Sequence, residues 1–269
     1  MHISQVNIYP VKSCAGISLE AGEITPRGFR NDRRWLVVDE RWDFLTQREI
    51  KEMALIRTAV DAQCLYLSAP QHGEFDLTVD QGGKRVEVSI WKDSGVGAVD
   101  QGDAVAAWLS EFLKHDVRLV RFADDYTRQV DQKYALRESD QVGFADGYPF
   151  LIISEESLED LNTRLEEPLP MNRFRPNIVV RGATPYAEDS WKTILINDVL
   201  FDLVKDCARC AITTTDQETA RRGKEPLRTL AMYRQGPKGS PLFGQNAAHR
   251  SLGTIHVNDT IEVVEYRNE

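Results

Sequence analysis

The sequence has few cysteines and no long hydrophobic run, and each of these absences narrows what the protein can be. Four cysteines in 269 residues are too few for a disulfide scaffold. No run of about 18 apolar residues occurs, so the sequence predicts no membrane-spanning helix and no membrane partner. The first residues have no basic stretch followed by an apolar one, as a secretory signal peptide would. We therefore expect a cytoplasmic protein.

An excess of positive charge is also missing. The chain carries 33 Lys and Arg against 42 Asp and Glu, a formal net charge of −9. Because an acidic surface repels phosphate backbones, the sequence predicts no nucleic-acid polymer as partner. Hydrophobic residues make up 42% and charged residues 28%, which excludes global disorder and allows one large folded domain or two modest ones.

Short apolar runs separated by Gly, Pro, Asn and Asp dominate the chain. Gly82 and Gly83 lie between two of these runs, and such a pair is typical of a hairpin turn. Many short strands with frequent turns favour a barrel or strongly curved sheets. The predicted strands cover residues 35–38, 75–79, 85–90, 117–122, 177–180, 199–204 and 260–264.

Two stretches have the spacing of amphipathic helices. Asp103 is expected to cap the first, whose apolar side chains recur at residues 105, 108, 109, 112 and 113. Ser154 is expected to cap the second, with Glu155 and Glu156 in a favourable first turn. Together with the strands, these helices predict a β-rich α+β protein.

Composition also suggests where the chain divides. Residues 123–140 are polar and charged with few apolar anchors, so we predict one domain over residues 1–122 and a second over residues 123–269. Residues 219–239 are rich in Arg, Lys, Gly and Pro. This composition predicts a long surface loop.

The strongest local feature is the close pair Cys207 and Cys210, which follows the strand predicted over residues 199–204. Such a pair has four interpretations: half of a zinc site, a redox dithiol, a single-thiolate metal ligand, or two unreactive buried residues. A zinc site needs a second ligand pair. However, Cys14 and Cys64 lie 50 residues apart, and the five histidines form no close pair.

The residues around the cysteine pair favour a metal-binding thiolate. A redox dithiol normally opens a helix, whereas a β-branched run over residues 212–215 follows here. Lys205 and Arg209 flank the cysteines, and nearby positive charge favours the thiolate that binds metals.

Three further clusters of basic and polar residues lie at predicted strand ends or turns. They cover residues 10–14, 30–35 and 172–177. Arg binds phosphate in bidentate fashion, so these clusters suit a phosphate-bearing ligand. Each cluster taken alone also fits a solvated loop, and the sequence alone does not show that they converge.

Seven motifs follow one another along nearly the whole chain. They are Ile-Tyr-Pro-Val-Lys-Ser at 8–13, Asn-Asp-Arg-Arg-Trp-Leu-Val at 31–37, Phe-Ala-Asp-Gly-Tyr-Pro-Phe-Leu at 144–151, Phe-Arg-Pro-Asn-Ile-Val at 174–179, Cys-Ala-Arg-Cys at 207–210, Pro-Leu-Phe-Gly-Gln-Asn at 241–246 and Gly-Thr-Ile at 253–255. In this order they resemble the MOSC family. The resemblance is strongest to the branch with bacterial YcbX-type proteins and the mitochondrial amidoxime-reducing component.

The resemblance implies an N-terminal β-barrel-like domain followed by a MOSC β-barrel domain with a few helices. It also implies molybdenum held by molybdopterin and one protein cysteine, which matches Cys210 and leaves Cys207 as a neighbour. One soft thiolate suits such a metal. The cofactor-binding residues that it implies, besides Cys210, are Lys12, Ser13, Arg33, Gly147, Tyr148, Arg175, Asn177, Ala208, Arg209 and Asn246.

The family resemblance further implies an enzyme that reduces N-hydroxylated compounds such as amidoximes, hydroxylamines and N-hydroxylated bases. Asp146 is a candidate for supplying the proton, although a turn-capping role fits equally. The chain has no cysteine set for an iron–sulfur cluster. We therefore expect electrons from a separate ferredoxin, flavodoxin-reductase or cytochrome b5-like protein. Two alternatives remain open: a carrier of molybdenum cofactor or persulfide sulfur, and a plain zinc or interaction module.

Overall fold

Strands make up most of the regular structure of the protein. The computed structural model describes residues 1–79, 82–133 and 135–267. Within these ranges three α-helices accompany the strands, and the largest sheet curls into a half-barrel. The prediction of a β-rich α+β protein is therefore confirmed. In the same ranges, no helix is both long and apolar enough to cross a lipid bilayer.

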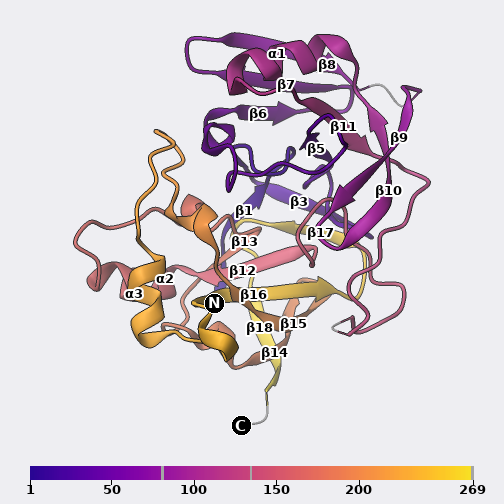
Figure 1. Ribbon diagram of the computed structural model, residues 1–269. Helices are drawn as coiled ribbons and strands as arrows, with labels where there is room; N and C mark the ends of the chain where they lie inside the picture. The colour runs from indigo at the N-terminus through magenta and orange to yellow at the C-terminus, as the bar shows by residue number, and fades with distance from the viewer. Residues whose placement is uncertain (80–81, 134, 268–269) are drawn as a thin grey trace.

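An eight-stranded sheet forms the lower half of the molecule in Figure 1. The first strand of the chain, β1, pairs with β13 and β2, so the two ends of the chain share this sheet. Only β12 and β13 run parallel, and the other paired neighbours are antiparallel. In sheet order the strands are β18 (Ile261–Tyr266), β14 (Trp191–Ile196), β15 (Val199–Ala208), β16 (Leu242–His249), β12 (Phe150–Ser154), β13 (Ile178–Arg181), β1 (His2–Ile8) and β2 (Ile17–Leu19).

A three-stranded sheet closes over one face of the large sheet. It consists of β17 (Gly253–His256), β3 (Ala21–Thr25) and β4 (Gly28–Phe29). Phe29 packs edge-on against Phe150 of β12 at 4.9 Å between ring centroids, and Phe150 in turn meets Phe201 of β15 at 5.2 Å. These buried rings join both sheets into one hydrophobic core.

The upper half of the molecule contains two smaller sheets and a helix. Helix α1 (Asp103–Leu113) packs its buried face on the same core as strands of both sheets. One sheet has the order β5 (Trp35–Val38), β11 (Arg118–Phe122), β10 (Asp93–Asp100) and β9 (Arg85–Ile90). The other has the order β6 (Arg57–Val60), β7 (Cys64–Ala69) and β8 (Gly73–Thr78).

The expected hairpin at Gly82 and Gly83 is wrong. Strand β8 pairs with β7, while β9 pairs with β10, so the two strands that flank these glycines belong to different sheets. The glycines lie in a connection between sheets. Two-residue turns join neighbouring strands only when these strands pair with each other.

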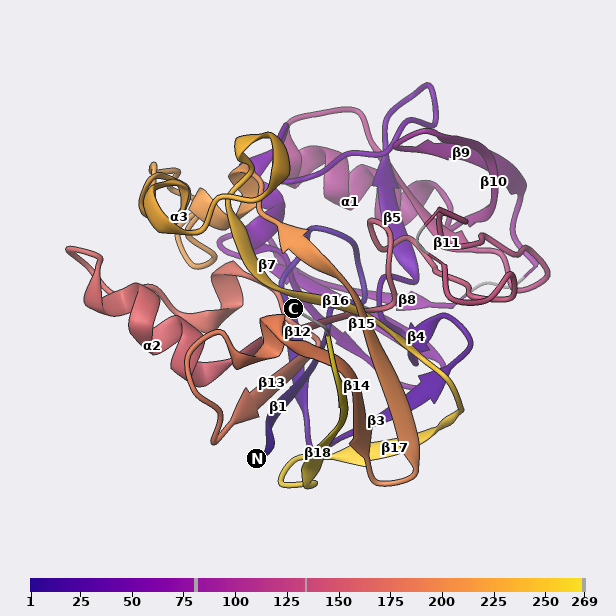
Figure 2. The same cartoon turned by 90° about the horizontal axis from the view of Figure 1, so that it is seen from below.

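The three α-helices can be compared with the sequence predictions one by one. Ser154 caps α2 (Glu155–Thr163) as predicted, because its side chain accepts a hydrogen bond from the backbone N–H of Ser157 at 3.2 Å. Helix α1 begins one residue earlier than expected, because Gly102 and not Asp103 occupies the cap position. Helix α3 (Leu227–Tyr233) occupies part of the predicted loop 219–239 and corrects it. Leu230 is buried in one cluster with Leu161 of α2 and Phe243 of β16, and this burial stabilises the helix. Figure 2 shows α2 and α3 on the same side of the molecule.

Short 3₁₀ helices occupy several connections. The one after the cysteine pair contains most of the β-branched run over residues 212–215. They are η1 (Lys51–Leu55), η2 (Met171–Arg173), η3 (Ala187–Asp189), η4 (Ala211–Thr214) and η5 (Pro237–Gly239). Between β11 and β12, the described residues form no named helix or strand. Strands β1 to β4 share their sheets with C-terminal strands, so the sheets do not mark a boundary at residue 122. The division of the chain at that point stays a prediction.

Candidate cofactor site

A cavity of about 350 Å³ opens between the large sheet and the upper half of the molecule. Its walls come from six separate parts of the chain, which the fold brings together. Every residue that the sequence proposed for catalysis or cofactor binding lines it, although their roles stay predictions. They are Lys12, Ser13, Arg33, Asp146, Gly147, Tyr148, Arg175, Asn177, Ala208, Arg209, Cys210 and Asn246.

Asn177 connects three of these wall segments. Its amide Nδ2 donates to the backbone oxygen of Asn7 in β1 at 3.1 Å. Its Oδ1 accepts from Arg33 Nη1 at 3.0 Å and from the backbone N–H of Leu151 at 3.2 Å. Asn177 is 1% exposed, so a buried amide with several partners holds the strand ends at the cavity floor in one arrangement.

Two arginines converge on one aromatic ring at the cavity. The guanidinium carbons of Arg33 and Arg175 lie 4.3 Å and 4.2 Å from the centroid of the Tyr9 ring. Burial lowers the pKa of Arg175 to about 10. Ser13, Arg33 and Arg175 all have left-handed backbone angles, with φ of 69°, 46° and 57°. Such strain in three non-glycine residues around one cavity is typical of a functional site.

Two buried guanidinium nitrogens at this cavity lack a protein partner. In the described part of the chain, neither Arg175 Nη2 nor Arg209 Nε makes a hydrogen bond. Buried donors of this kind are rare, because an unmade hydrogen bond costs about 1–3 kcal/mol, and more for a charged group. An anionic ligand such as a phosphate would satisfy both, so these residues fit a phosphorylated cofactor.

The two cysteines of the close pair have different surroundings. Cys207, at the end of β15, accepts a hydrogen bond on Sγ from Arg209 Nη1 at 2.9 Å and packs against the hydrophobic cluster around Phe174. Cys210 precedes η4, and its Sγ accepts from Arg48 Nη2 at 3.1 Å. The redox-dithiol interpretation expected the pair to open an α-helix, and a 3₁₀ turn follows instead.

The zinc interpretation gains no support from the other cysteines. Cys14 is fully buried, and burial raises the pKa of its thiol to about 12. Within the described ranges, no group of three or more His, Cys, Asp or Glu side chains could hold a metal ion. A zinc site needs four such ligands, whereas a cofactor that brings its own sulfurs needs only one.

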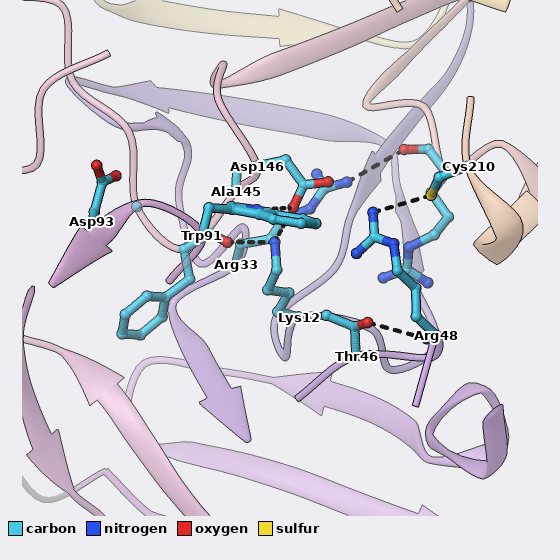
Figure 3. Close-up of polar contacts among 12 residues, drawn as sticks. Lys12, Arg33, Thr46, Arg48, Trp91, Asp93, Ala145, Asp146 and Cys210 are labelled. Atoms are coloured by element: carbon cyan, nitrogen blue, oxygen red, sulfur yellow. Dashed lines mark hydrogen bonds and ion pairs between the residues drawn. The ribbon is translucent and has the colours of Figure 1, made fainter. Parts of the chain in front are cut away.

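Asp146 lies at the cavity mouth beside a buried lysine (Figure 3). Lys12 Nζ donates to Asp146 Oδ1 and to the backbone oxygen of Phe144, the latter at 2.9 Å. Desolvation by the surrounding protein raises the pKa of Asp146, but the charge and hydrogen bond of Lys12 outweigh it and hold this pKa well below its usual range. Asp146 is therefore a carboxylate at neutral pH, and it accepts hydrogen bonds.

Sequence reasoning missed two residues at this site, Arg48 and Trp91. Arg48 lies in the loop between β5 and η1, and Arg222 braces that loop by donating to the backbone oxygens of Gln47 and Arg48. Trp91 lies in the turn between β9 and β10, and its indole N–H donates to Asp146 Oδ1 at 3.1 Å. No motif surrounds either residue, so the sequence held no signal for them.

Two sequence profiles match the chain. The profile described as "MOSC N-terminal beta barrel domain" covers residues 1–116, and the one described as "MOSC domain" covers residues 139–262. The chain belongs to the MOSC family. This confirms both the resemblance that the motifs carry and the expected order of an N-terminal β-barrel domain followed by a MOSC domain.

Several relatives of this MOSC protein match over most of their length. The human "Mitochondrial amidoxime-reducing component 1" is 38% identical over 276 residues, which cover 96% of this chain and 82% of the human protein. The mouse protein of the same name is 39% identical, with 96% and 81% covered. "Mitochondrial amidoxime reducing component 2" from Bos taurus is 36% identical, with 96% and 82% covered.

Proposed function

We propose that this MOSC protein is a molybdenum-cofactor oxidoreductase that reduces N-hydroxylated compounds, such as amidoximes, hydroxylamines and N-hydroxylated bases. The reaction breaks the N–O bond, consumes two electrons and two protons, and yields an amine or amidine and water. The observation that carries the proposal is the position of Cys210 in a cavity lined by Lys12, Arg33, Arg175 and Arg209. The names of its relatives support the same activity.

The residues of the cavity fit the molybdenum–molybdopterin cofactor. Cys210 would hold the metal, because a soft thiolate suits it, and the two unpartnered guanidinium nitrogens of Arg175 and Arg209 would hold the phosphate. When bound, the cofactor supplies a metal that accepts an oxygen atom and changes oxidation state. The other residues that would contact it are Lys12, Ser13, Arg33, Gly147, Tyr148, Asn177, Ala208 and Asn246.

We assign the supply of protons to the pair of Lys12 and Asp146. Asp146 alone is a poor acid, since its pKa lies well below its usual range. Burial lowers the pKa of Lys12, although Asp146 opposes the shift, so this ammonium group gives up a proton more readily than an exposed lysine. A proton on Lys12 Nζ can pass to Asp146 Oδ1, which accepts a hydrogen bond from it.

The electrons would come from a separate electron-transfer protein of the ferredoxin, flavodoxin-reductase or cytochrome b5-like class. This partner, a small-molecule substrate and the cytoplasmic location that the sequence suggested all remain predictions. Arg48 and Arg209 place positive charge beside the sulfur atoms of the cysteine pair. Positive charge near the cavity would favour a negatively charged partner protein.

Metal and pterin content tests the proposal first. The wild-type protein and its Cys207→Ala and Cys210→Ala variants are purified after expression with molybdate, and each is assayed for benzamidoxime reduction with a chemical reductant. We expect about one molybdenum and one pterin per wild-type chain, turnover by the wild type, and loss of molybdenum in Cys210→Ala with a much milder effect in Cys207→Ala.

The alternatives give different results in the same experiment. Cofactor bound without any turnover would indicate a carrier, and a cyanide-labile sulfur on cysteine would indicate a persulfide carrier. Zinc without molybdenum or pterin would indicate a zinc module. Any of these three results would overturn the proposed reduction.

A further inference from the structure

A continuous chain of side-chain contacts runs along the cavity from Lys12 to Cys210, and the proposed cofactor contacts do not account for two of its members, Trp91 and Arg48 (Figure 3). It begins at Lys12, which donates to Asp146 Oδ1, and continues to the indole N–H of Trp91, which donates to the same oxygen at 3.1 Å. The guanidinium carbon of Arg48 lies 4.5 Å from the Trp91 ring centroid, and its Nη2 reaches Cys210 Sγ at 3.1 Å. These contacts link Trp91 and Asp146 to Cys210 through Arg48.

Trp91 occupies a position that stability alone does not favour. It is 45% exposed, and its φ of 56° places a bulky residue in the left-handed region. Phe44, at 4.9 Å between ring centroids, and Arg48 hold the indole in place. A large aromatic ring that is braced on some sides and open to solvent on others can bind the flat face of a ligand.

Asp146 offers a hydrogen-bond acceptor beside this ring. Both of its protein donors, Lys12 Nζ and Trp91 Nε1, bond to Oδ1. No residue in the described ranges donates to Oδ2, and the side chain is 59% exposed. A carboxylate oxygen accepts two hydrogen bonds, so Oδ2 is available to the N–H groups of a ligand.

We propose that Trp91 and Oδ2 of Asp146 form a substrate subsite for a flat N–C–N group that carries N–H donors, as in an amidoxime, an N-hydroxyguanidine or an amino-substituted N-hydroxylated base. This inference rests on the proposed function and specifies its substrate class. The delocalised group would stack on the indole while its amino group donates to the carboxylate. A simple alkyl hydroxylamine has no such plane and would gain little from either contact.

The amidine product suits the same subsite, which allows a test that needs no metal. Benzamidine is flat and cationic, so both the ring and the carboxylate attract it. We would titrate it into the full-length protein purified without molybdate, and follow binding by calorimetry and tryptophan fluorescence. Wild type should bind with quenched fluorescence, and both Trp91→Ala and Asp146→Asn should weaken binding about tenfold.

Two variants separate the subsite from unrelated effects in this titration. Trp91→Phe keeps an aromatic ring, so it should bind benzamidine within about threefold of wild type while losing the quenching. Trp108→Phe removes a tryptophan of α1, away from the cavity, and should keep both. If Trp91→Ala and Asp146→Asn bind benzamidine as tightly as wild type does, the subsite does not exist.

The holoenzyme gives the second test. Trp91→Ala should raise KM for benzamidoxime about tenfold. It should change kcat for benzamidoxime, and KM for N-cyclohexylhydroxylamine, by less than about threefold. Trp91→Phe should restore the low KM. Equal losses with both compounds would overturn the inference. Failure of the proposed function would appear differently, as no reduction of either compound by wild type, and the benzamidine titration would still decide on the subsite.

Discussion

Arg48 Nη2 donates a hydrogen bond of 3.1 Å to Cys210 Sγ across 162 residues of sequence. The loop that carries Arg48 is held from two sides. Gln47 donates to the backbone oxygen of Ser13 at 2.7 Å, and Arg222 donates to the backbone oxygen of Arg48 at 3.1 Å. The part of the chain before β6 therefore supplies a positive charge directly to the proposed metal-binding sulfur.

Replacing Arg48 should lower the reduction potential of the bound molybdenum. A hydrogen bond and a positive charge at a ligating sulfur withdraw electron density and stabilise the reduced metal. We expect Arg48→Met to shift the potential downward by roughly tens of millivolts, and Arg48→Lys to shift it less. The measurement is a redox titration in which electron paramagnetic resonance monitors the molybdenum signal. Arg181→Met, which removes a surface arginine paired with Glu155, is the matched control. An unchanged potential in Arg48→Met would exclude a role at the sulfur.

Lys12 should control the pH at which Asp146 loses its charge. Because the charge and hydrogen bond of Lys12 lower the pKa of Asp146, removal of Lys12 should raise it. The acid limb of kcat/KM for benzamidoxime should therefore move to higher pH in Lys12→Met, and less so in Lys12→Arg. Rates are normalised to bound molybdenum, since Lys12 also lines the cofactor cavity. Identical pH profiles in Lys12→Met and wild type would show that Asp146 takes no part in the supply of protons.

Local rules predicted the elements whose signals lie within a few residues. The strand over residues 35–38 follows from a short apolar run, and the capping of α2 by Ser154 follows from side-chain hydrogen bonding. Both are present. The predicted loop over residues 219–239 failed because α3 depends on tertiary packing. Leu230 is fully buried among side chains of other elements, and this burial outweighs the loop-like composition.

The residues of the candidate site also fall into a group that the sequence predicted and a group that it did not. Motif resemblance identified the predicted residues of the cavity wall, because each of them lies within one of the motifs that carry the resemblance. The sequence did not predict Arg48 and Trp91 as site residues, because their positions depend on contacts between distant segments. Trp91 meets Asp146 across 55 residues, and nothing in the turn between β9 and β10 indicates this. Only the packing of the upper half against the large sheet brings them to Cys210.

Arg175 should affect cofactor retention more than stability. Its Nη2 is buried without a protein partner, and burial lowers the pKa of its guanidinium to about 10. Loss of a charged hydrogen bond to phosphate costs about 1.5–3 kcal/mol, so Arg175→Met should weaken pterin binding roughly tenfold to a hundredfold.

The stability of the cofactor-free protein should respond much less than cofactor retention. Replacing a buried charge with an apolar side chain is often neutral, so the free energy of unfolding of the cofactor-free Arg175→Met protein should change by less than about 2 kcal/mol. Pterin content and denaturant unfolding are measured beside Arg181→Met. Full pterin retention in Arg175→Met would remove this residue from the cofactor site.

His249 should make the protein sensitive to acid. Burial lowers the pKa of His249 from 6.5 to about 4, nearby Arg137 adds to the effect, and Asp140 opposes it. Between these two values the unfolded chain binds a proton here that the folded chain does not, so the free energy of unfolding falls as the pH drops from 6.5 to 4. The slope from one such group is at most about 1.4 kcal/mol per pH unit.

His249→Gln removes this titration and should therefore unfold with a shallower pH dependence across the same window. Denaturant unfolding at pH 4, 5, 6 and 7 measures the difference between variant and wild type. This difference should favour the variant increasingly as the pH drops, and it should level off below about pH 4, where the folded protein also becomes protonated. A constant difference across the four pH values would show that His249 does not titrate differently in the folded and unfolded states.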